Sequence, residues 1–141
     1  MAAVIRDGSR FLMVEELAGG QRVLNQPAGH LEQGESLVEA VRREVMEETT
    51  HAFEPGGLVG VYRWTHPHGD STFLRFCFTG ELGHAEPNAR RDPDILATHW
   101  LDAETIRAAA GRLRSPLVLR CLEDALARTA MPLDMLHDVA S

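Results

Sequence analysis

Three glutamates that lie close together in the sequence, Glu44, Glu47 and Glu48, have the residue type and spacing most suited to chemistry. They fall within the segment Ser36–Thr49, whose pattern predicts a helix. On a wheel of about 100° per residue, they lie at the edge of the apolar arc of Leu37, Val38, Val41 and Val45. Like charges three or four residues apart destabilise a helix by about 0.2–0.5 kcal/mol per pair, and partial burial increases that cost.

A divalent cation would remove this repulsion, because Mg²⁺ prefers clustered carboxylate oxygens. The alternative is a solvated acidic helix face, but the position at the rim of the apolar arc favours the cation. The formal net charge is −7, and all fourteen basic residues are arginine. The acidic balance argues against a nucleic-acid polymer as partner, and the absence of lysine excludes a P-loop. Binding a polyphosphate then requires local positive charge from arginine or from a metal ion.

The segment GHLEQGESLVEAVRREVMEETTH, residues 29–51, resembles the Nudix box, G-x5-E-x7-R-E-U-x-E-E-x-G-U with U aliphatic. Two positions depart from the pattern: Thr50 stands in place of glycine and His51 in place of an aliphatic residue. Both follow the carboxylates and leave them intact. The matching positions are Gly29, Glu35, Arg43, Glu44, Val45, Glu47 and Glu48.

The resemblance implies a role for each matching residue. Glu47 and Glu48 would be ligands of Mg²⁺, for which Mn²⁺ could substitute, and Glu44 a further ligand or the base that activates water. Glu35 would assist or bind a second ion, Arg43 would hold a glutamate in place, and the Gly29 carbonyl would be an extra ligand. Arg43 is counted with Glu44 and Glu48 as catalytic. The implied fold is an α/β Nudix fold, a mixed β-sheet sandwiched between helices.

Further segments are similar to the NudJ-type phosphatases of that family. They are NQPAGHLE, FLRF (73–76), LRSPLV (113–118) and the tail 132–135. This subgroup removes phosphate from nucleoside tri- and diphosphates with little base selectivity, and hydrolyses hydroxymethylpyrimidine diphosphate, a thiamine precursor. Such a phosphohydrolase of small-molecule substrates is the function expected here.

Four residues outside the helix are candidates for binding the substrate, each with a structural alternative. Arg75 could reach phosphate or pair with a carboxylate at the core edge. Trp64 could stack on a pyrimidine or simply pack. Gln26, with Asn25, could bind a base or serve a turn. Arg10 could bind substrate or be a solvated strand end.

Two alternative functions stay open at this stage. Pro67 lies sixteen residues past the box, where a proline marks ADP-ribose-cleaving Nudix enzymes, although turns also recruit proline. A non-catalytic nucleotide sensor of the same fold is the other alternative, and the full set of glutamates counts against it. Asp92 and Asp94 could lend a late carboxylate to the metal site or lie in a solvated loop.

The remaining pattern predicts strands, one helix, strands and two helices in a single domain, residues 1–141. No apolar run is long enough to span a membrane, no secretory signal is evident, and Cys77 and Cys121 are expected to be reduced core thiols. A cytoplasmic monomer or weak homodimer is expected. The predicted strands are 2–6, 10–15, 58–65, 71–81 and 98–101, with a turn at 54–57; the predicted helices are 36–49, 102–110 and 116–128.

Overall fold

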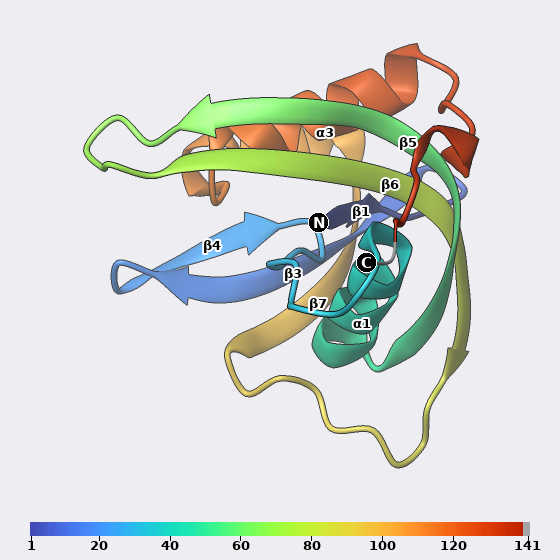
Figure 1. The fold of residues 1–141 in the computed structure, drawn as a ribbon. Helices are drawn as coiled ribbons and strands as arrows, with labels where there is room; N and C mark the ends of the chain where they lie inside the picture. The colour runs from blue at the N-terminus through green and yellow to red at the C-terminus, as the bar shows by residue number, and fades with distance from the viewer. Residues whose placement is uncertain (140–141) are drawn as a thin grey trace.

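The computed structural model describes residues 1–139 and places two β-sheets between helices (Figure 1). One sheet has the order β1-β6-β5, in which β1 runs parallel and β5 antiparallel to β6. In the other, β3 pairs with β2, β4 and β7, all antiparallel. The strands are β1 (Ala2–Val4), β2 (Arg6–Asp7), β3 (Arg10–Ala18), β4 (Gln21–Asn25), β5 (His51–Thr65), β6 (Thr72–Ala85) and β7 (Ile95–Asp102).

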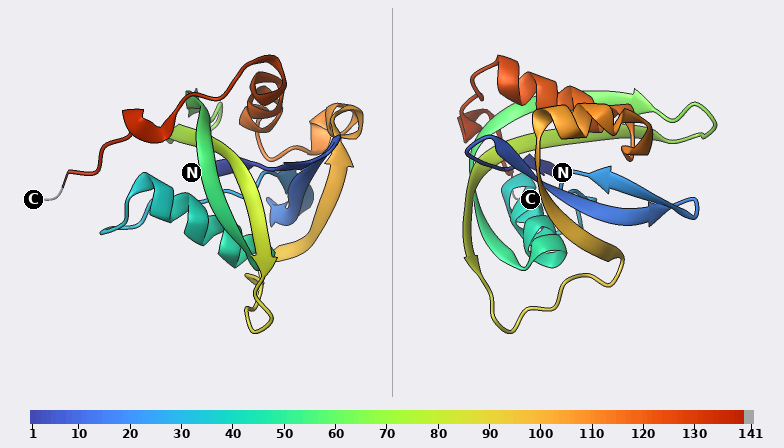
Figure 2. Two further views of the ribbon diagram at one scale, coloured as in Figure 1. Left: turned by 90° about the vertical axis from the view of Figure 1, so that its right-hand side faces the viewer. Right: turned by 180° about the vertical axis from the view of Figure 1, so that it is seen from behind.

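The helices cover opposite sides of these strands, as Figure 2 shows. Helix α1 (Leu37–Thr49) packs on β5 and β1, and helix α3 (Pro116–Ala127) packs on the other side of the same strands. The short helix α2 (Ala103–Ala108) packs against β7 and α3. Two 3₁₀ turns, η1 (Ala110–Arg112) and η2 (Leu133–Met135), complete the described elements. The predicted mixed sheet between helices is therefore confirmed.

Alternation along the first strand explains why there are two hydrophobic cores. Ala2 and Val4 face the α3 side, where the buried residues include Met13 and Cys121. Ala3 and Ile5 face the α1 side; the buried residues there include Leu12, Val41, Val45, Phe53, Leu58 and Phe78. Cys77 and Cys121 are both buried and free, in the α3-side core.

Helix α1 begins and ends with identifiable caps. Ser36 accepts a hydrogen bond from the Glu39 amide, and the Glu39 side chain accepts one from the Ser36 amide, which is the predicted capping box. The C-cap residue is Thr50, which has φ 61° and ψ 17° and donates its amide to the Met46 carbonyl. This left-handed conformation favours glycine. The first departure from the Nudix pattern, Thr50, therefore puts a β-branched residue in a backbone conformation that glycine adopts more readily.

The structure corrects several predicted boundaries. The residues predicted to turn at Glu54–Gly57 lie inside β5, where the pairing with β6 shifts between Pro55 and Gly57. Strand β6 continues to Ala85, and β7 begins at Ile95 instead of Thr98. Strand β4 was not predicted. Within residues 1–139, no helix is long and apolar enough to cross a membrane.

Candidate active site

Helix α1 places two of its three glutamates against the protein. Glu44 and Glu48 are only 7% and 6% exposed, whereas the Glu47 side chain remains 46% exposed. Burial raises the pKa of Glu44 above its ordinary value. Burial is also the main reason why the pKa of Glu48 is raised to about 8. The nearby carboxylates of Glu44, Glu16 and Asp92 also raise the pKa of Glu48. A buried acidic pair at one helix rim is costly without a cation.

The segment before the helix closes over these carboxylates. The Ala28 amide donates to Glu48 Oε1 at 2.8 Å. Gly29 lies so close to Glu44 that a Cβ atom there would overlap its carboxylate group. Glycine is therefore required at this position because a side chain would not fit. Its backbone conformation does not require glycine, since its φ lies outside the left-handed region. The Gly29 carbonyl accepts a hydrogen bond from the amino group of Met1 at 2.6 Å.

Arg43 is the centre of the ion pairs around the helix. Its guanidinium holds Glu35 with two hydrogen bonds, of 3.0 and 2.7 Å, and this pairing lowers the pKa of Glu35 to about 2. It also donates to Glu44 at 2.7 Å, to Glu47 at 3.2 Å and to the His30 carbonyl at 2.8 Å. One arginine thus joins the loop before the helix to the carboxylates on it.

The carboxylate and carbonyl oxygens of this site are the ligand type that a hard cation such as Mg²⁺ prefers. Within residues 1–139, no three His, Cys, Asp or Glu side chains converge closely enough to hold a metal ion as they stand. Glu44 and Glu47 turn towards Arg43, and Glu48 turns towards the Ala28 amide. A cation would be held with help from a backbone oxygen such as that of Gly29, or after one carboxylate turns. The donor set and the close approach of Gly29 to Glu44 fit Mg²⁺.

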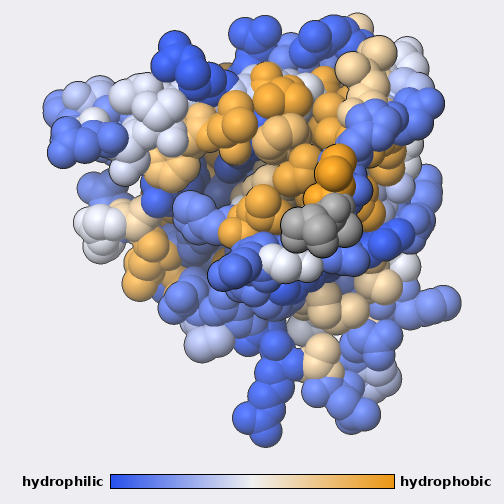
Figure 3. Space-filling model, in the orientation of Figure 1, coloured by the Kyte–Doolittle hydropathy of each residue, from blue (hydrophilic) through white to orange (hydrophobic). Residues whose placement is uncertain are grey.

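A cavity of about 860 Å³ opens beside the box and is lined by Ala28, Gly29 and His30. Hydrophobic side chains gather beside the hollow on this face of the molecule, as Figure 3 shows. Its lining also includes Met1, Glu16, Leu17, Asn25, Leu31, Leu37, Trp64, Phe73, Leu74, Arg75, Phe76, Pro93, Asp94, Leu96, Arg114, Ser115 and Leu117. Because Ala28 and Gly29 contact Glu48 and Glu44 from the other side, the cavity adjoins the acidic site.

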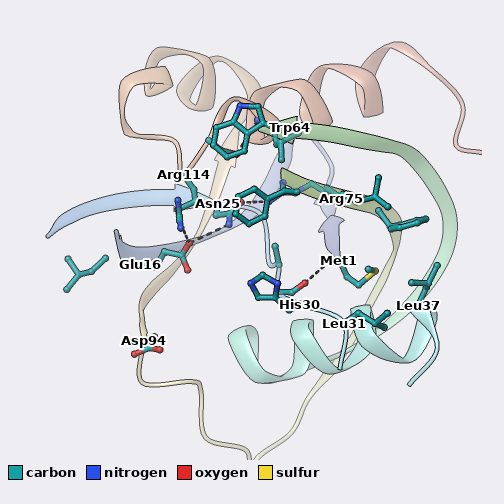
Figure 4. A pocket seen from close by; sticks show the side chains of 18 of the residues that line it. Met1, Glu16, Asn25, His30, Leu31, Leu37, Trp64, Arg75, Asp94 and Arg114 are labelled. Carbon is teal, nitrogen blue, oxygen red and sulfur yellow. Dashed lines mark hydrogen bonds and ion pairs between the residues drawn. The ribbon is translucent and has the colours of Figure 1, made fainter. Parts of the chain in front are cut away.

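Two of the four substrate-binding candidates line this cavity (Figure 4). Arg75 is half-buried and donates to the Asn25 and Gln26 side chains at 3.2 and 3.1 Å. It makes no ion pair with a carboxylate within residues 1–139. Trp64 is half-buried and stacks on Phe73, with ring centroids 5.7 Å apart.

The other two candidates lie elsewhere. Gln26 is 2% exposed and does not line the cavity, since its amide donates to the Val118 carbonyl and accepts from Arg75. The structure therefore makes it a support for Arg75 and not a group that meets a base. Arg10 is exposed at the start of β3, opposite Asp102 and away from the cavity. It matches the alternative interpretation, a solvated strand end.

The loop before β7 stays close to the acidic helix. The Asp92 amide donates to the Glu47 carbonyl at 2.7 Å, and Asp94 lines the cavity. Pro67 lies in the exposed tip of the β5–β6 hairpin.

Sequence reasoning missed two cavity residues, Glu16 and Arg114. The Arg114 Nε atom lies 3.7 Å from Glu16 Oε1. Glu16 follows Glu15, which turns the other way to pair with Arg22 and His99. The register of β3 with β7 shifts between these two glutamates. No local signal in the sequence separates their roles.

Comparison with known proteins identifies this arrangement. A family model described as the NUDIX domain matches residues 1–120, which include the box and the strands around it. The chain belongs to the Nudix family. It is similar to phosphatase NudJ of Escherichia coli K12, with 41% identity over 98% of this chain and 89% of that protein. The NudJ of Shigella flexneri matches equally.

Solved structures agree with this assignment. A NUDIX hydrolase from Nitrosomonas europaea superposes with a TM-score of 0.94 and 44% identity, over 98% of this chain and 94% of that one. The Escherichia coli ORF135 protein shares the fold, with a TM-score of 0.71 and 21% identity over 89% of this chain and 86% of that one. This chain is therefore a Nudix hydrolase, acting on phosphate anhydrides of small molecules.

Proposed function

We propose that this Nudix hydrolase is a Mg²⁺-dependent phosphatase of nucleoside tri- and diphosphates and of hydroxymethylpyrimidine diphosphate. The observation that carries the proposal is the burial of Glu44 and Glu48 directly behind Ala28 and Gly29, which line a cavity large enough for such a substrate. Similarity to phosphatase NudJ over almost the whole chain supports the phosphatase reaction in particular.

The bound metal would neutralise charge on the phosphate groups and favour attack of water on phosphorus. Glu47 and Glu48 would hold it, with the Gly29 carbonyl and Glu35 as further ligands. Glu44 would accept the proton of the attacking water, and the burial that raises its pKa makes it a stronger base than an exposed glutamate. Arg43 would keep Glu44 and Glu35 in position.

Arg75 would contact the phosphate chain from the opposite wall of the cavity. Its partners are two neutral amide oxygens, so no carboxylate among residues 1–139 cancels its positive charge. A guanidinium in that situation has donors to spare for a phosphate oxygen. Arg75 would thus supply the local positive charge that a protein of net charge −7 needs in order to bind a polyphosphate.

The two alternatives have no comparable support. Pro67 lies at an exposed hairpin tip, where turn formation explains a proline. A non-catalytic sensor would have no use for the buried pair Glu44 and Glu48.

A substrate panel with Mg²⁺, Mn²⁺ or EDTA tests the proposal. It compares hydroxymethylpyrimidine diphosphate, thiamine diphosphate, nucleoside di- and triphosphates and ADP-ribose, and identifies orthophosphate, pyrophosphate or AMP as products. The expected result is orthophosphate release from hydroxymethylpyrimidine diphosphate and from the nucleoside di- and triphosphates, abolished by EDTA. Release of AMP from ADP-ribose as the dominant reaction, or no turnover of any compound, would contradict it.

A further inference from the structure

A chain of side-chain amides runs from helix α3 to the cavity wall and fixes which atoms face the cavity. The Val118 carbonyl can only accept, so it requires the Gln26 amide nitrogen, which donates to it at 2.8 Å. The Gln26 oxygen is then directed to Arg75, which donates to it at 3.1 Å. Since Gln26 is almost completely buried, this orientation cannot reverse without leaving buried groups unpaired.

The same logic extends to the next residue. Arg75 can only donate, and it donates to Asn25 Oδ1 at 3.2 Å. The Asn25 nitrogen must therefore point the other way, towards Glu16 Oε1 at 3.5 Å. Asn25 is 7% exposed and lines the cavity, so its second N–H hydrogen is available to a bound molecule.

Glu16 is the last member of this chain and has an acceptor to spare. Its contacts with Asn25 and Arg114 are long and both fall on Oε1. Within residues 1–139, no hydrogen bond reaches Oε2, although the side chain is only 21% exposed. Figure 4 shows Glu16 beside Asn25 at the cavity wall. A carboxylate oxygen in such a place is best satisfied by an N–H group of a ligand.

From this polarity we infer that the cavity recognises a ring that carries an amino group next to a ring nitrogen, with Glu16 and Asn25 as the specificity-determining residues. The amino group donates to Glu16, and the ring nitrogen accepts from the Asn25 amide. The stacked pair Trp64 and Phe73 gives the ring an aromatic wall. This inference rests on the proposed function, because it assumes that the phosphate groups of the same molecule lie at Gly29.

The substrate class that this wall would favour is narrower than the one that the family resemblance implies. Aminopyrimidines, including hydroxymethylpyrimidine diphosphate, and the cytosine ring all present this edge. The uracil ring presents the reverse, a ring N–H beside a carbonyl oxygen, which would face the Asn25 donor and the Glu16 acceptor with the wrong polarity. Low base selectivity, as the resemblance implies, would not follow from this wall.

The wild-type enzyme tests the inference without any variant. Initial rates of orthophosphate release from cytidine and uridine triphosphate, with Mg²⁺, give the ratio of the two kcat/KM values. A preference for cytidine of about tenfold or more is expected, because an unmatched buried polar group discriminates strongly. Equal kcat/KM values would overturn the inference and leave the proposed phosphatase intact. Failure to release phosphate from either compound would instead contradict the proposed function.

The variant Glu16→Gln assigns the preference to a residue. A glutamine amide can either accept or donate, so the ratio of the cytidine to the uridine kcat/KM should fall to within about twofold of unity, mainly through a loss of kcat/KM for cytidine triphosphate. Glu81→Gln, which removes the same charge at an exposed position on β6, should leave the ratio unchanged. An equal loss on both substrates in Glu16→Gln, at an unchanged melting temperature, would mean that Glu16 serves the metal or the chemistry and would refute its role in specificity.

Discussion

The substitution Gly29→Ala separates the chemistry of this site from its fold. The Gly29 backbone is not in the left-handed region, so alanine is acceptable there on conformational grounds. The added Cβ, however, would overlap the carboxylate of Glu44. Because that carboxylate is the end of a flexible side chain, it can move aside without unfolding the protein.

The size of the effect follows from the displacement. The carboxylate must move by more than about 1 Å to restore ordinary van der Waals contact, and a misplacement of even about 1 Å at a catalytic group costs on the order of 100-fold in rate. We therefore expect kcat to fall about 100-fold at saturating Mg²⁺, whereas KM changes little. The free energy of unfolding should fall by only about 1 kcal/mol, as for an ordinary point substitution.

Initial rates of orthophosphate release and thermal melts measure both quantities. Gly111→Ala is the matched control, since a Cβ at Gly111 meets nothing within 4 Å, and it should be neutral in both assays. The double variant Gly29→Ala with Glu44→Asp shortens the displaced side chain and should recover part of the activity. Normal turnover by folded Gly29→Ala would refute the assignment of Glu44 to the reaction.

Four further predictions concern the same region. Glu44→Gln should lower kcat by about 100-fold or more at saturating Mg²⁺; near-normal turnover would exclude it as the base. Because the pKa of Glu48 is raised to about 8 from 4.5 in the unfolded chain, folded metal-free protein holds a proton that the unfolded chain releases. Its stability should therefore fall by up to about 1.4 kcal/mol per pH unit between these values. Melting temperatures in EDTA should show this decline, Mg²⁺ should reverse it, and Glu48→Gln should make it smaller. Thr50→Gly should raise the free energy of unfolding by about 1 kcal/mol, measured by denaturant titration, since it relieves a left-handed β-branched residue; a loss of stability would contradict this. Arg75→Ala should act mainly on KM, as expected for a residue that binds phosphate: the fold-increase in KM should exceed the fold-decrease in kcat by at least about tenfold.

The local features of this protein could be read from its sequence. The capping box of Ser36 and Glu39 and the apolar stripe of α1 depend on residues within four positions of each other, and both are found as predicted. The same periodicity placed Glu44 and Glu48 at the edge of the buried face, where they lie. The helix exit was less visible, because only the backbone shows that Thr50 takes the conformation in which the family pattern has glycine.

Elements that depend on pairing with distant strands were misjudged. Glu54–Gly57 has the composition of a turn, yet it continues β5 because β6 pairs along it and Gly80 leaves room for the close approach. Strand propensity is weak compared with such tertiary pairing. For the same reason, strands β6 and β7 were predicted to be shorter than they are.

The far wall of the cavity was decided only by the tertiary structure. Gln26 and Val118 are 92 positions apart, yet the hydrogen bond between them orients Arg75 and, through it, Asn25 and Glu16. Local patterns determine which residues share a helix face, because the backbone repeat sets that geometry. The polarity of a buried chain of amides depends on donors and acceptors brought together from separate strands, and no spacing in the sequence encodes it.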